Sequence, residues 1–544
     1  MRAISTHSAY GRRAIEDWSS RDFDVLVIGA GINGAGLARD LAMRGLDVLL
    51  VDKGDFASGT SSASTKLVHG GLRYMENFDF SLVFEACRER AVLQKIASHL
   101  VQPLPFFIPV YRGDPRPLWM VRAGLMLYDL LSTFRSVGYH RILSAVRALS
   151  LAPVLQPQGL RGVARYWDCR MDDARLCLEN VIAAAEAGAQ VGNYLEAVAL
   201  SYCGGTLSGA TLRDLESGRE IKVHARCVVN AAGPWLDKVR ALDGEYGELL
   251  RPTRGTHILV PRIGQCAEAL YLTAGSDERL FFVIPWGDLS LIGTTDVDYS
   301  DDPDRVMPTR DDIDYLLAES RRHLRDVELG RDDVVAAFAG LRPLIAEDQE
   351  SASKVSREHR VVVSSSGLIS VGGGKYTTYR AVAEEVADLV VARLGLKDPG
   401  CRTDRVALPG GEGMQIRAGH RHHWRMLRKL GGVSAAQVER LAALYGARTR
   451  QLLAMLEDDP GLAEPVCAGS ELLRVQVAYG VLHEMARCPA DLLRRRTPLA
   501  LGKGRGLTEL KAVAEQMAKL LGADAEVVQR WQEEYRRQTA LDES

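Results

Sequence analysis

Residues 22–53 read DFDVLVIGAGINGAGLARDLAMRGLDVLLVDK. The apolar run DVLVI at 24–28 predicts a short buried parallel strand, and the glycine-rich GAGING follows at 29–34. A helical pattern then continues to about Arg44 and stops at Gly45, a residue type that commonly ends helices. A second apolar run, DVLLV, predicts another strand that ends next to Asp52. The segment is therefore predicted to be one βαβ unit.

The glycines of this unit fit a dinucleotide-binding turn. Gly29 permits the tight turn, Gly31 lets a pyrophosphate approach the backbone, and Gly34 lets helix and strand pack closely. The phosphates would lie at the helix N-terminus, where free N–H groups and the helix dipole favour anions. Asp52 follows at the spacing of about 20 residues expected for an acid on the ribose hydroxyls, which argues against NADP. FAD and NAD both stay open at this point.

Outward from this unit, strand and helix patterns alternate. Apolar runs at 228–235, 257–261, 280–286 and 289–296 predict strands, and 361–374 predicts a hairpin that leads into a helix at 377–394. A Gly- and Pro-rich linker at 395–413 precedes a largely helical end of the chain. The pattern predicts an α/β domain with a second sheet inserted in it, and a separate helical domain.

Composition restricts the function classes. The chain has 544 residues, 47% apolar and 25% charged, which predicts two or three ordinary globular domains. The net charge of −2 gives no general reason to expect nucleic-acid binding. The nine cysteines form no C-x-x-C pair, so we expect reduced cysteines and no metal site. Neither a secretory signal nor a transmembrane helix is expected.

Two features of the sequence are compatible with binding to a membrane surface. The sequence WMVRAGLMLYDLL at 119–131 predicts an amphipathic helix, which could pack on the core or lie in a membrane interface. Cations cluster at 420–429 and at 494–505, in Arg494, Arg495, Arg496, Lys503 and Arg505. These clusters would be solvated or subunit-contacting surfaces, or would attract anionic headgroups.

Six motifs together resemble one enzyme family. They are GAGINGAG (29–36), TSSASTKLVHGGLRY (60–74), NAAGPW (230–235), IGTTDV (292–297), GLRPL (340–344) and GGGKYTTYR (372–380). In this order they resemble the FAD-dependent, quinone-reducing glycerol-3-phosphate dehydrogenases. The resemblance decides for FAD over NAD.

The resemblance implies a fold. The expected fold class is α/β, with a Rossmann-like FAD-binding domain of the glutathione-reductase or D-amino-acid-oxidase type. An inserted antiparallel β-sheet domain would bind the substrate, and a C-terminal α-helical domain would follow. We expect the FAD-binding domain to comprise 22–110, 150–245 and 340–400, the substrate-binding domain 111–149 and 246–339, and the helical domain 401–544.

The resemblance also implies a reaction. Family members oxidise sn-glycerol 3-phosphate to dihydroxyacetone phosphate by hydride transfer from C2 to FAD, and electrons pass to a membrane quinone. The chain would then be cytoplasmic and peripheral on the inner face of the cytoplasmic membrane, with a homodimer as an open alternative. Competing hypotheses are an oxidase that uses O2, a flavin-binding protein without turnover, and an amine or amino-acid oxidase.

By match to the family's motifs, cofactor contacts fall mainly in two glycine-rich regions. Small and hydroxyl side chains after Gly59 would lie against the flavin and its diphosphate, and Val198 is a candidate for the adenine pocket. The N-terminus of the helix at 377 would face the flavin, where its dipole favours negative charge. The predicted cofactor-binding residues are Gly29, Gly31, Gly34, Asp52, Thr60, Ser61, Ser62, Ser64, Thr65, Lys66, His69, Gly70, Gly71, Val198, Ala232, Gly233, Gly373, Gly374, Lys375, Tyr376 and Thr377.

The substrate brings a phosphate dianion, which favours forked and permanently charged donors. The candidates are Arg73, Arg342 and Arg357, with a hydroxyl donor from Tyr74. The C2 hydroxyl must lose a proton, and by match to the family His257 is the candidate base. Lys375 would assist by polarising the oxygen, so His257, Arg342 and Lys375 are the predicted catalytic residues.

Overall fold

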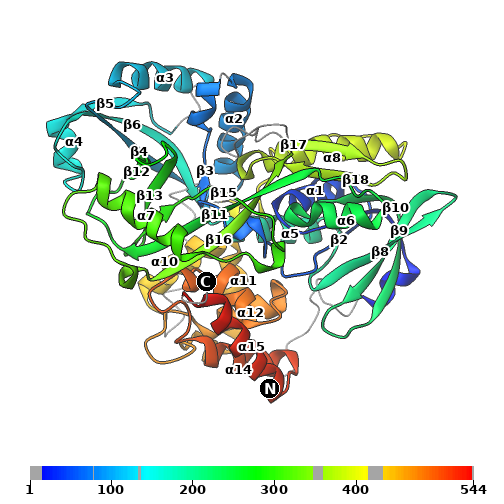
Figure 1. The fold of residues 1–544 in the computed structure, drawn as a ribbon. Coiled ribbons are helices and arrows are strands. Elements are labelled where there is room, and N and C mark those ends of the chain that lie inside the picture. Colours follow the sequence, from blue (N-terminus) through cyan, green and yellow to red (C-terminus); the bar gives the residue numbers. More distant parts are fainter. Residues whose placement is uncertain (1–14, 78, 133–136, 347–358, 414–432, 542–544) are drawn as a thin grey trace.

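A computed structural model describes residues 15–77, 79–132, 137–346, 359–413 and 433–541 (Figure 1). Its first sheet has the order β17-β18-β10-β1-β2-β7, with the hairpin β8–β9 joined to β10. The central pairs β18–β10, β10–β1, β1–β2 and β2–β7 are all parallel. The strands are β1 (Asp22–Ile28), β2 (Val48–Val51), β7 (Gln190–Gly192), β8 (Leu195–Cys203), β9 (Thr206–Asp214), β10 (Glu220–Asn230), β17 (His359–Val363) and β18 (Ile369–Gly373).

The predicted βαβ unit forms the centre of this sheet. β2 is completely buried, as expected of a continuous apolar run in a parallel sheet covered by helices. The helix between the strands, α1 (Ile32–Met43), packs between α5 (Asp173–Glu186) and α8 (Tyr379–Arg393). Both partners are far away in sequence, so the chain leaves this sheet and returns to it.

The second sheet is mostly antiparallel and has the order β15-β11-β14-β13-β12-β4-β6-β3, with β16 paired to β11 and β5 to β6. The helix α7 (Arg310–His323) packs on it through Ile313, Leu316 and Leu317. The strands are β3 (Leu67–Val68), β4 (Val101–Tyr111), β5 (Arg141–Ser144), β6 (Leu160–Met171), β11 (Leu250–Pro261), β12 (Ala269–Thr273), β13 (Leu280–Trp286), β14 (Leu289–Gly293), β15 (Val297–Asp298) and β16 (Ala336–Ile345).

The end of the chain is helical, as predicted, and has hydrophobic clusters of its own. We call residues 433–541 the C-terminal domain; they lie below the two sheets in Figure 1. Its helices are α10 (Ala435–Tyr445), α11 (Thr449–Asp458), α12 (Arg474–His483), α13 (Pro489–Asp491), α14 (Leu510–Leu521) and α15 (Ala525–Thr539). The remaining helices of the described chain are α2 (Phe80–Ile96), α3 (Leu118–Leu131), α4 (Ala145–Leu151) and α6 (Leu236–Leu242).

The predicted architecture of two sheets and a helical domain is confirmed. The second sheet, however, takes up β3, β4, β6 and β16, although most of these residues were expected in the FAD-binding domain. The expected domain boundaries stay a prediction. The helix expected at 377–394 begins at Tyr379, after a short 3₁₀ turn at Tyr376–Thr378.

The amphipathic helix at 119–131 is α3, and it buries only one side. Leu125 and Tyr128 pack into a hydrophobic cluster with Phe106 and Tyr166 of the second sheet, whereas Trp119 is 72% exposed and Leu130 is 58% exposed. No helix of the described chain has the length and apolar character needed to span a membrane.

The interpretation of 494–505 as a surface cation cluster is wrong for Arg495 and Arg496, whereas Lys503 is exposed. Arg495 and Arg496 are buried against Asp55. Lys503 pairs with Asp288 at 2.7 Å, and Arg505 donates to the Thr539 carbonyl. The other cluster, 420–429, lies outside the described residues.

Candidate active site

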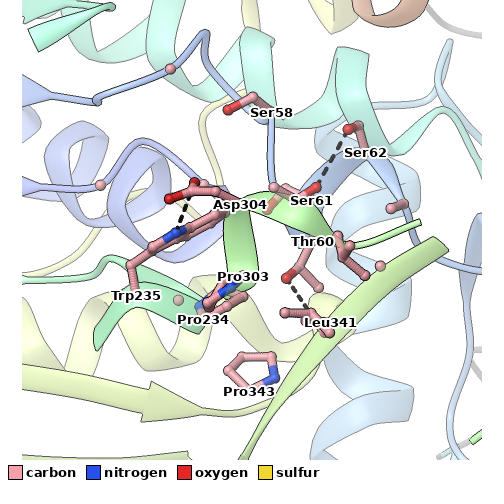
Figure 2. Close-up of a pocket in the computed structure, with 18 of the residues that line it drawn as sticks. Ser58, Thr60, Ser61, Ser62, Pro234, Trp235, Pro303, Asp304, Leu341 and Pro343 are labelled. Carbon is pink, nitrogen blue, oxygen red and sulfur yellow. Dashed lines mark hydrogen bonds between the residues drawn. The ribbon is translucent and has the colours of Figure 1, made fainter. Parts of the chain in front are cut away.

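A cavity of about 1590 Å³ lies where the two sheets and the C-terminal domain meet. Figure 2 shows part of its wall, with Ser58, Thr60, Ser61 and Ser62 on one loop. Thr60 Oγ1 donates to the Leu341 carbonyl at 2.6 Å, which ties this loop to β16. Trp235 Nε1 donates to Asp304 at 3.0 Å and so joins the loop after β10 to the segment after β15.

The glycine turn has the geometry that its motif requires. Gly29 has a φ of +104°, and a Cβ there would lie 2.6 Å from the Ala231 carbonyl oxygen. A Cβ on Gly34 would lie 1.8 Å from the Gly29 oxygen, so only glycine allows α1 to approach β1 this closely. Gly31 differs, because a Cβ there would meet only Ser61 Oγ, at 3.1 Å. Its open side faces the cavity, as a site for an approaching phosphate requires.

Asp52 lies at the tip of β2 and lines the same cavity. Its carboxylate accepts hydrogen bonds from the backbone N–H groups of Ala30, at 2.6 Å, and Gly54, at 2.8 Å. Burial nevertheless raises the pKa of Asp52 to about 6. A partner that donates hydrogen bonds, such as a ribose diol, would stabilise the carboxylate form.

Most predicted cofactor residues line this cavity. Ser61 Oγ also accepts a hydrogen bond from the Ile32 N–H at 2.9 Å and so fixes loop 60–65 against the start of α1. The predicted cofactor residues on the wall are Gly29, Gly31, Asp52, Thr60, Ser61, Ser62, Ser64, Thr65, His69, Val198, Ala232, Gly233, Gly373, Gly374, Lys375, Tyr376 and Thr377.

The other predicted cofactor residues lie elsewhere. Lys66 is buried behind the wall, where its Nζ pairs with Asp173 at 2.6 Å and braces the loop. A Cβ on Gly70 would lie 2.3 Å from the Tyr128 hydroxyl, so Gly70 is required for packing. Gly71 lines a second, smaller chamber, and Gly34 packs α1 against β1 as described above.

This second chamber has a volume of about 120 Å³ and adjoins the main cavity. Thr65, Leu67, His69, Tyr74 and Arg342 line both spaces. Arg342 extends from β16, and its Nη1 pairs with Asp296 at 3.0 Å. Its Nη2 donates to Thr294 Oγ1 at 2.8 Å. These contacts hold the guanidinium between the two spaces.

His257 lies on β11 and is only 2% exposed. Its ring stacks on Phe338 with centroids 4.9 Å apart, and its Nε2 lies 2.9 Å from Thr65 Oγ1. Burial, together with the charges of Arg342 and Lys66, lowers the pKa of His257 well below its usual value. The imidazole is therefore neutral at working pH.

Lys375 and Tyr74 meet beside the main cavity, with Nζ 3.5 Å from the centre of the tyrosine ring. This cation–π contact lies just before the turn that begins α8. The structure does not describe the Arg73 side chain, and Arg357 lies outside the described residues. The predicted His257, Arg342, Tyr74 and Lys375 are thus brought together.

Sequence reasoning missed two groups on these walls. Arg279 lines the small chamber together with Arg342 and donates to the carbonyl of Asp296, the residue with which Arg342 is also paired. The C-terminal domain contributes Cys488, Asp491, Arg494 and Arg495 to the main cavity. The arginine run was visible in the sequence, but nothing there indicated that it folds back over the cavity.

We call the glycine turn, Asp52 and loop 60–62 the glycine-rich end of the site, and His257, Arg342, Tyr74 and Lys375 the charged end. The glycine-rich end fits FAD, because it offers a backbone cradle, an acid for the ribose and a cavity large enough for a dinucleotide. The described residues contain no cluster of three or more His, Cys, Asp or Glu suited to a metal ion.

Comparisons with known proteins agree with this geometry. A family model described as FAD dependent oxidoreductase matches residues 24–389. A second, described as the C-terminal domain of alpha-glycerophosphate oxidase, matches residues 401–528. A glycerol-3-phosphate dehydrogenase from Synechocystis is 41% identical over 88% of this chain and 89% of its own. The human mitochondrial glycerol-3-phosphate dehydrogenase is 36% identical over 93% of this chain and 71% of its own.

Solved structures give the same result. The glycerol-3-phosphate dehydrogenase from Bacillus halodurans, complexed with FAD, has a TM-score of 0.81 at 33% identity, over 97% of this chain and 96% of that one. The glycerophosphate oxidase of Mycoplasma pneumoniae, at a TM-score of 0.54 and 19% identity, shares the fold over 72% of this chain and 99% of that one. The chain therefore belongs to the glycerol-3-phosphate dehydrogenase family of FAD-dependent oxidoreductases.

Proposed function

We propose that this protein oxidises sn-glycerol 3-phosphate to dihydroxyacetone phosphate and passes the electrons to a membrane quinone. The observation that carries the proposal is one continuous site that joins a dinucleotide cradle to a buried neutral histidine and an arginine. A flavin-binding protein without turnover would have no need for the buried histidine and the arginine. FAD, when bound, supplies the acceptor for the hydride that leaves C2.

His257 takes the proton of the C2 hydroxyl in this proposal. Nε2 is the nitrogen that faces the substrate, because its partner Thr65 lines both the main cavity and the small chamber. The neutral ring can accept a proton at working pH. Burial and the charges of Arg342 and Lys66 disfavour the resulting imidazolium, so the ring does not retain the proton.

Arg342 binds the substrate's phosphate, and Tyr74 adds a hydroxyl donor. A guanidinium matches the geometry of phosphate oxygens and keeps its charge at all working pH values. Lys375 lies on Tyr74 and lines the main cavity, where it would polarise the substrate oxygen. Arg73 and Arg357 are proposed as further phosphate ligands from the family resemblance alone.

The half-reaction can be tested without an electron acceptor. Anaerobic addition of glycerol 3-phosphate to the holoenzyme is expected to bleach the flavin absorption band, and glycerol is not. An unchanged spectrum with glycerol 3-phosphate would leave flavin binding as the whole function.

The electron acceptor needs its own experiment, because an oxidase would share the same charged end. We expect turnover with a soluble quinone to exceed peroxide formation in air by a large factor. Rapid peroxide formation without added quinone would instead identify a glycerol-3-phosphate oxidase.

We propose that α3 docks the enzyme on the cytoplasmic face of the membrane, where quinone is found. Its unburied side presents Trp119, Met120, Met126 and Leu130, and Arg122 is also exposed on α3. Aromatic and aliphatic side chains beside arginines suit the headgroup boundary of an anionic bilayer. Figure 1 shows α3 at the far side of the second sheet from the C-terminal domain.

Co-sedimentation with anionic liposomes tests this docking surface. Trp119→Asp combined with Leu130→Asp should abolish pelleting. Tyr246→Asp, at a residue that is 82% exposed on the loop after α6, should leave it unchanged. Equal pelleting of all three proteins would exclude α3.

A further inference from the structure

The C-terminal domain is fastened to the first sheet directly beside Asp52. Asp55, three residues further on, is fully buried and accepts from Arg495 Nε at 2.5 Å and from Arg496 Nη2 at 2.8 Å. Arg495 also bridges to Asp491 at 2.7 Å, and the Tyr194 hydroxyl donates to Asp491 at 2.6 Å. The loops at the ends of β2 and β7 are therefore held by the C-terminal domain.

The same segment of the C-terminal domain forms part of the cavity wall. Asp491, Arg494 and Arg495 line the main cavity together with Asp52 and Gly31. The last turns of α15 add Gln538, whose Oε1 accepts from Arg494 Nη1 at 2.8 Å. Within the described chain, the site is thus bounded by three structural units, and the C-terminal domain is one of them.

Arg494 differs from the adjacent Arg495 in the number of carboxylates that surround its guanidinium. In the described part of the chain, Arg495 has two carboxylates within 4 Å, whereas Arg494 has none. The nearby Glu534 carboxylate accepts from Gln538 and Arg537. Burial and the like charge of Arg495 lower the pKa of the Arg494 guanidinium to about 10. A cation in this position would gain from an anion in the cavity.

We propose that the C-terminal domain is part of the cofactor site, and that Arg494 supplies a positive charge to the adenosine diphosphate half of FAD. The phosphates are the only charged groups of that cofactor, and Asp52 marks the ribose next to them. The ion pairs of Asp55 with Arg495 and Arg496 keep the adjacent Arg494 in position on the cavity wall. The proposal rests on FAD binding in this cavity and is independent of the substrate.

FAD release from the holoenzyme measures this role without any turnover. After dilution, recovery of flavin fluorescence should be about tenfold faster in Arg494→Gln than in the wild type, the effect of one lost charge-assisted contact. The difference should shrink at high salt, because ions screen the attraction. Arg494→Lys should release FAD at nearly the wild-type rate, since the charge is kept.

Arg530→Gln is the matched control, because Arg530 is exposed on α15. Release from Arg494→Gln at the wild-type rate, or an equal acceleration in Arg530→Gln, would overturn the proposal. Hydrogen exchange provides a second test in the wild-type chain. Residues 488–496 should exchange more slowly with FAD bound than without it, while α11 stays unchanged. Equal exchange of 488–496 in both states would also overturn the proposal.

Discussion

At the glycine-rich end of the site the wall is mostly backbone and small side chains, whereas at the charged end it consists of large ionisable groups. Gly29 and Gly34 act by leaving space, and their neighbours are main-chain atoms 1.8–2.6 Å from the position of a Cβ. Arg342 and His257 act through charge and protonation, and each is held by specific side chains. We therefore expect substitutions at the first end to act on folding and FAD binding, and those at the second to act on rate.

The largest expected effect separates two glycines of one motif. Gly34→Ala should lower the free energy of unfolding by about 3 kcal/mol or more and abolish FAD binding, because its Cβ would overlap the Gly29 oxygen. Gly31→Ala should leave the melting temperature of the FAD-free protein nearly unchanged but still weaken FAD binding, because its Cβ would enter the cavity. Thermal unfolding with and without FAD distinguishes them. Equal loss of stability in both variants would contradict the assignment of Gly31 to the cofactor.

At the charged end, His257→Gln should retain FAD but reduce flavin 10²- to 10⁴-fold more slowly, about the range for loss of a general base. His224→Gln, at an exposed position on β10, is the control and should behave as the wild type. Stopped-flow absorbance of the holoenzyme measures the rate. A wild-type rate in His257→Gln would assign the proton to another group.

The pH dependence of flavin reduction also tests the assignment of His257 as the base. Because the pKa of His257 lies well below its usual value, the ring is neutral on both sides of pH 6.5. The rate of flavin reduction should therefore show no inflection near that pH, and an acid limb should appear only at lower pH. An inflection close to pH 6.5 would mean that the base is a solvated histidine.

Arg342→Lys keeps the charge and removes the forked geometry. We expect kcat/KM for glycerol 3-phosphate to fall about 100-fold, with FAD content unchanged, because one charge-assisted contact to phosphate contributes about 2–3 kcal/mol. Arg251→Lys, at a solvent-facing pair with Asp298, should leave kcat/KM unchanged. A drop in FAD content in Arg342→Lys would contradict the assignment of FAD binding to the glycine-rich end and of catalysis to the charged end.

The smallest effect concerns Asp52. Its raised pKa of about 6 means that the FAD-free protein takes up a proton there as pH falls through 6. Ribose hydroxyls favour the carboxylate, so the FAD dissociation constant should rise as pH falls below about 6, by up to tenfold per pH unit. In Asp52→Asn this dependence should disappear. A dependence that persists in the variant would point to a different titrating group.

The same contrast explains what the sequence could predict. The βαβ unit, its glycines and Asp52 follow from local pattern, and the structure places them as expected. His257, Tyr74, Arg342 and Lys375 were found only through resemblance, because no spacing in one sequence brings β11 and β16 beside the start of α8. The pairing of Lys66 with Asp173, and the burial of Arg495 and Arg496 against Asp55, depend on partners more than 100 residues away. Such long-range ion pairs have no local signal.

The most direct measurement of the central claim is the anaerobic reduction of the bound flavin by glycerol 3-phosphate carrying deuterium at C2. If C2 delivers a hydride within the site described, the flavin band bleaches with either substrate, and several-fold more slowly with the deuterated one. A flavin that stays oxidised, or one whose reduction step has the same rate with both substrates, would contradict the account.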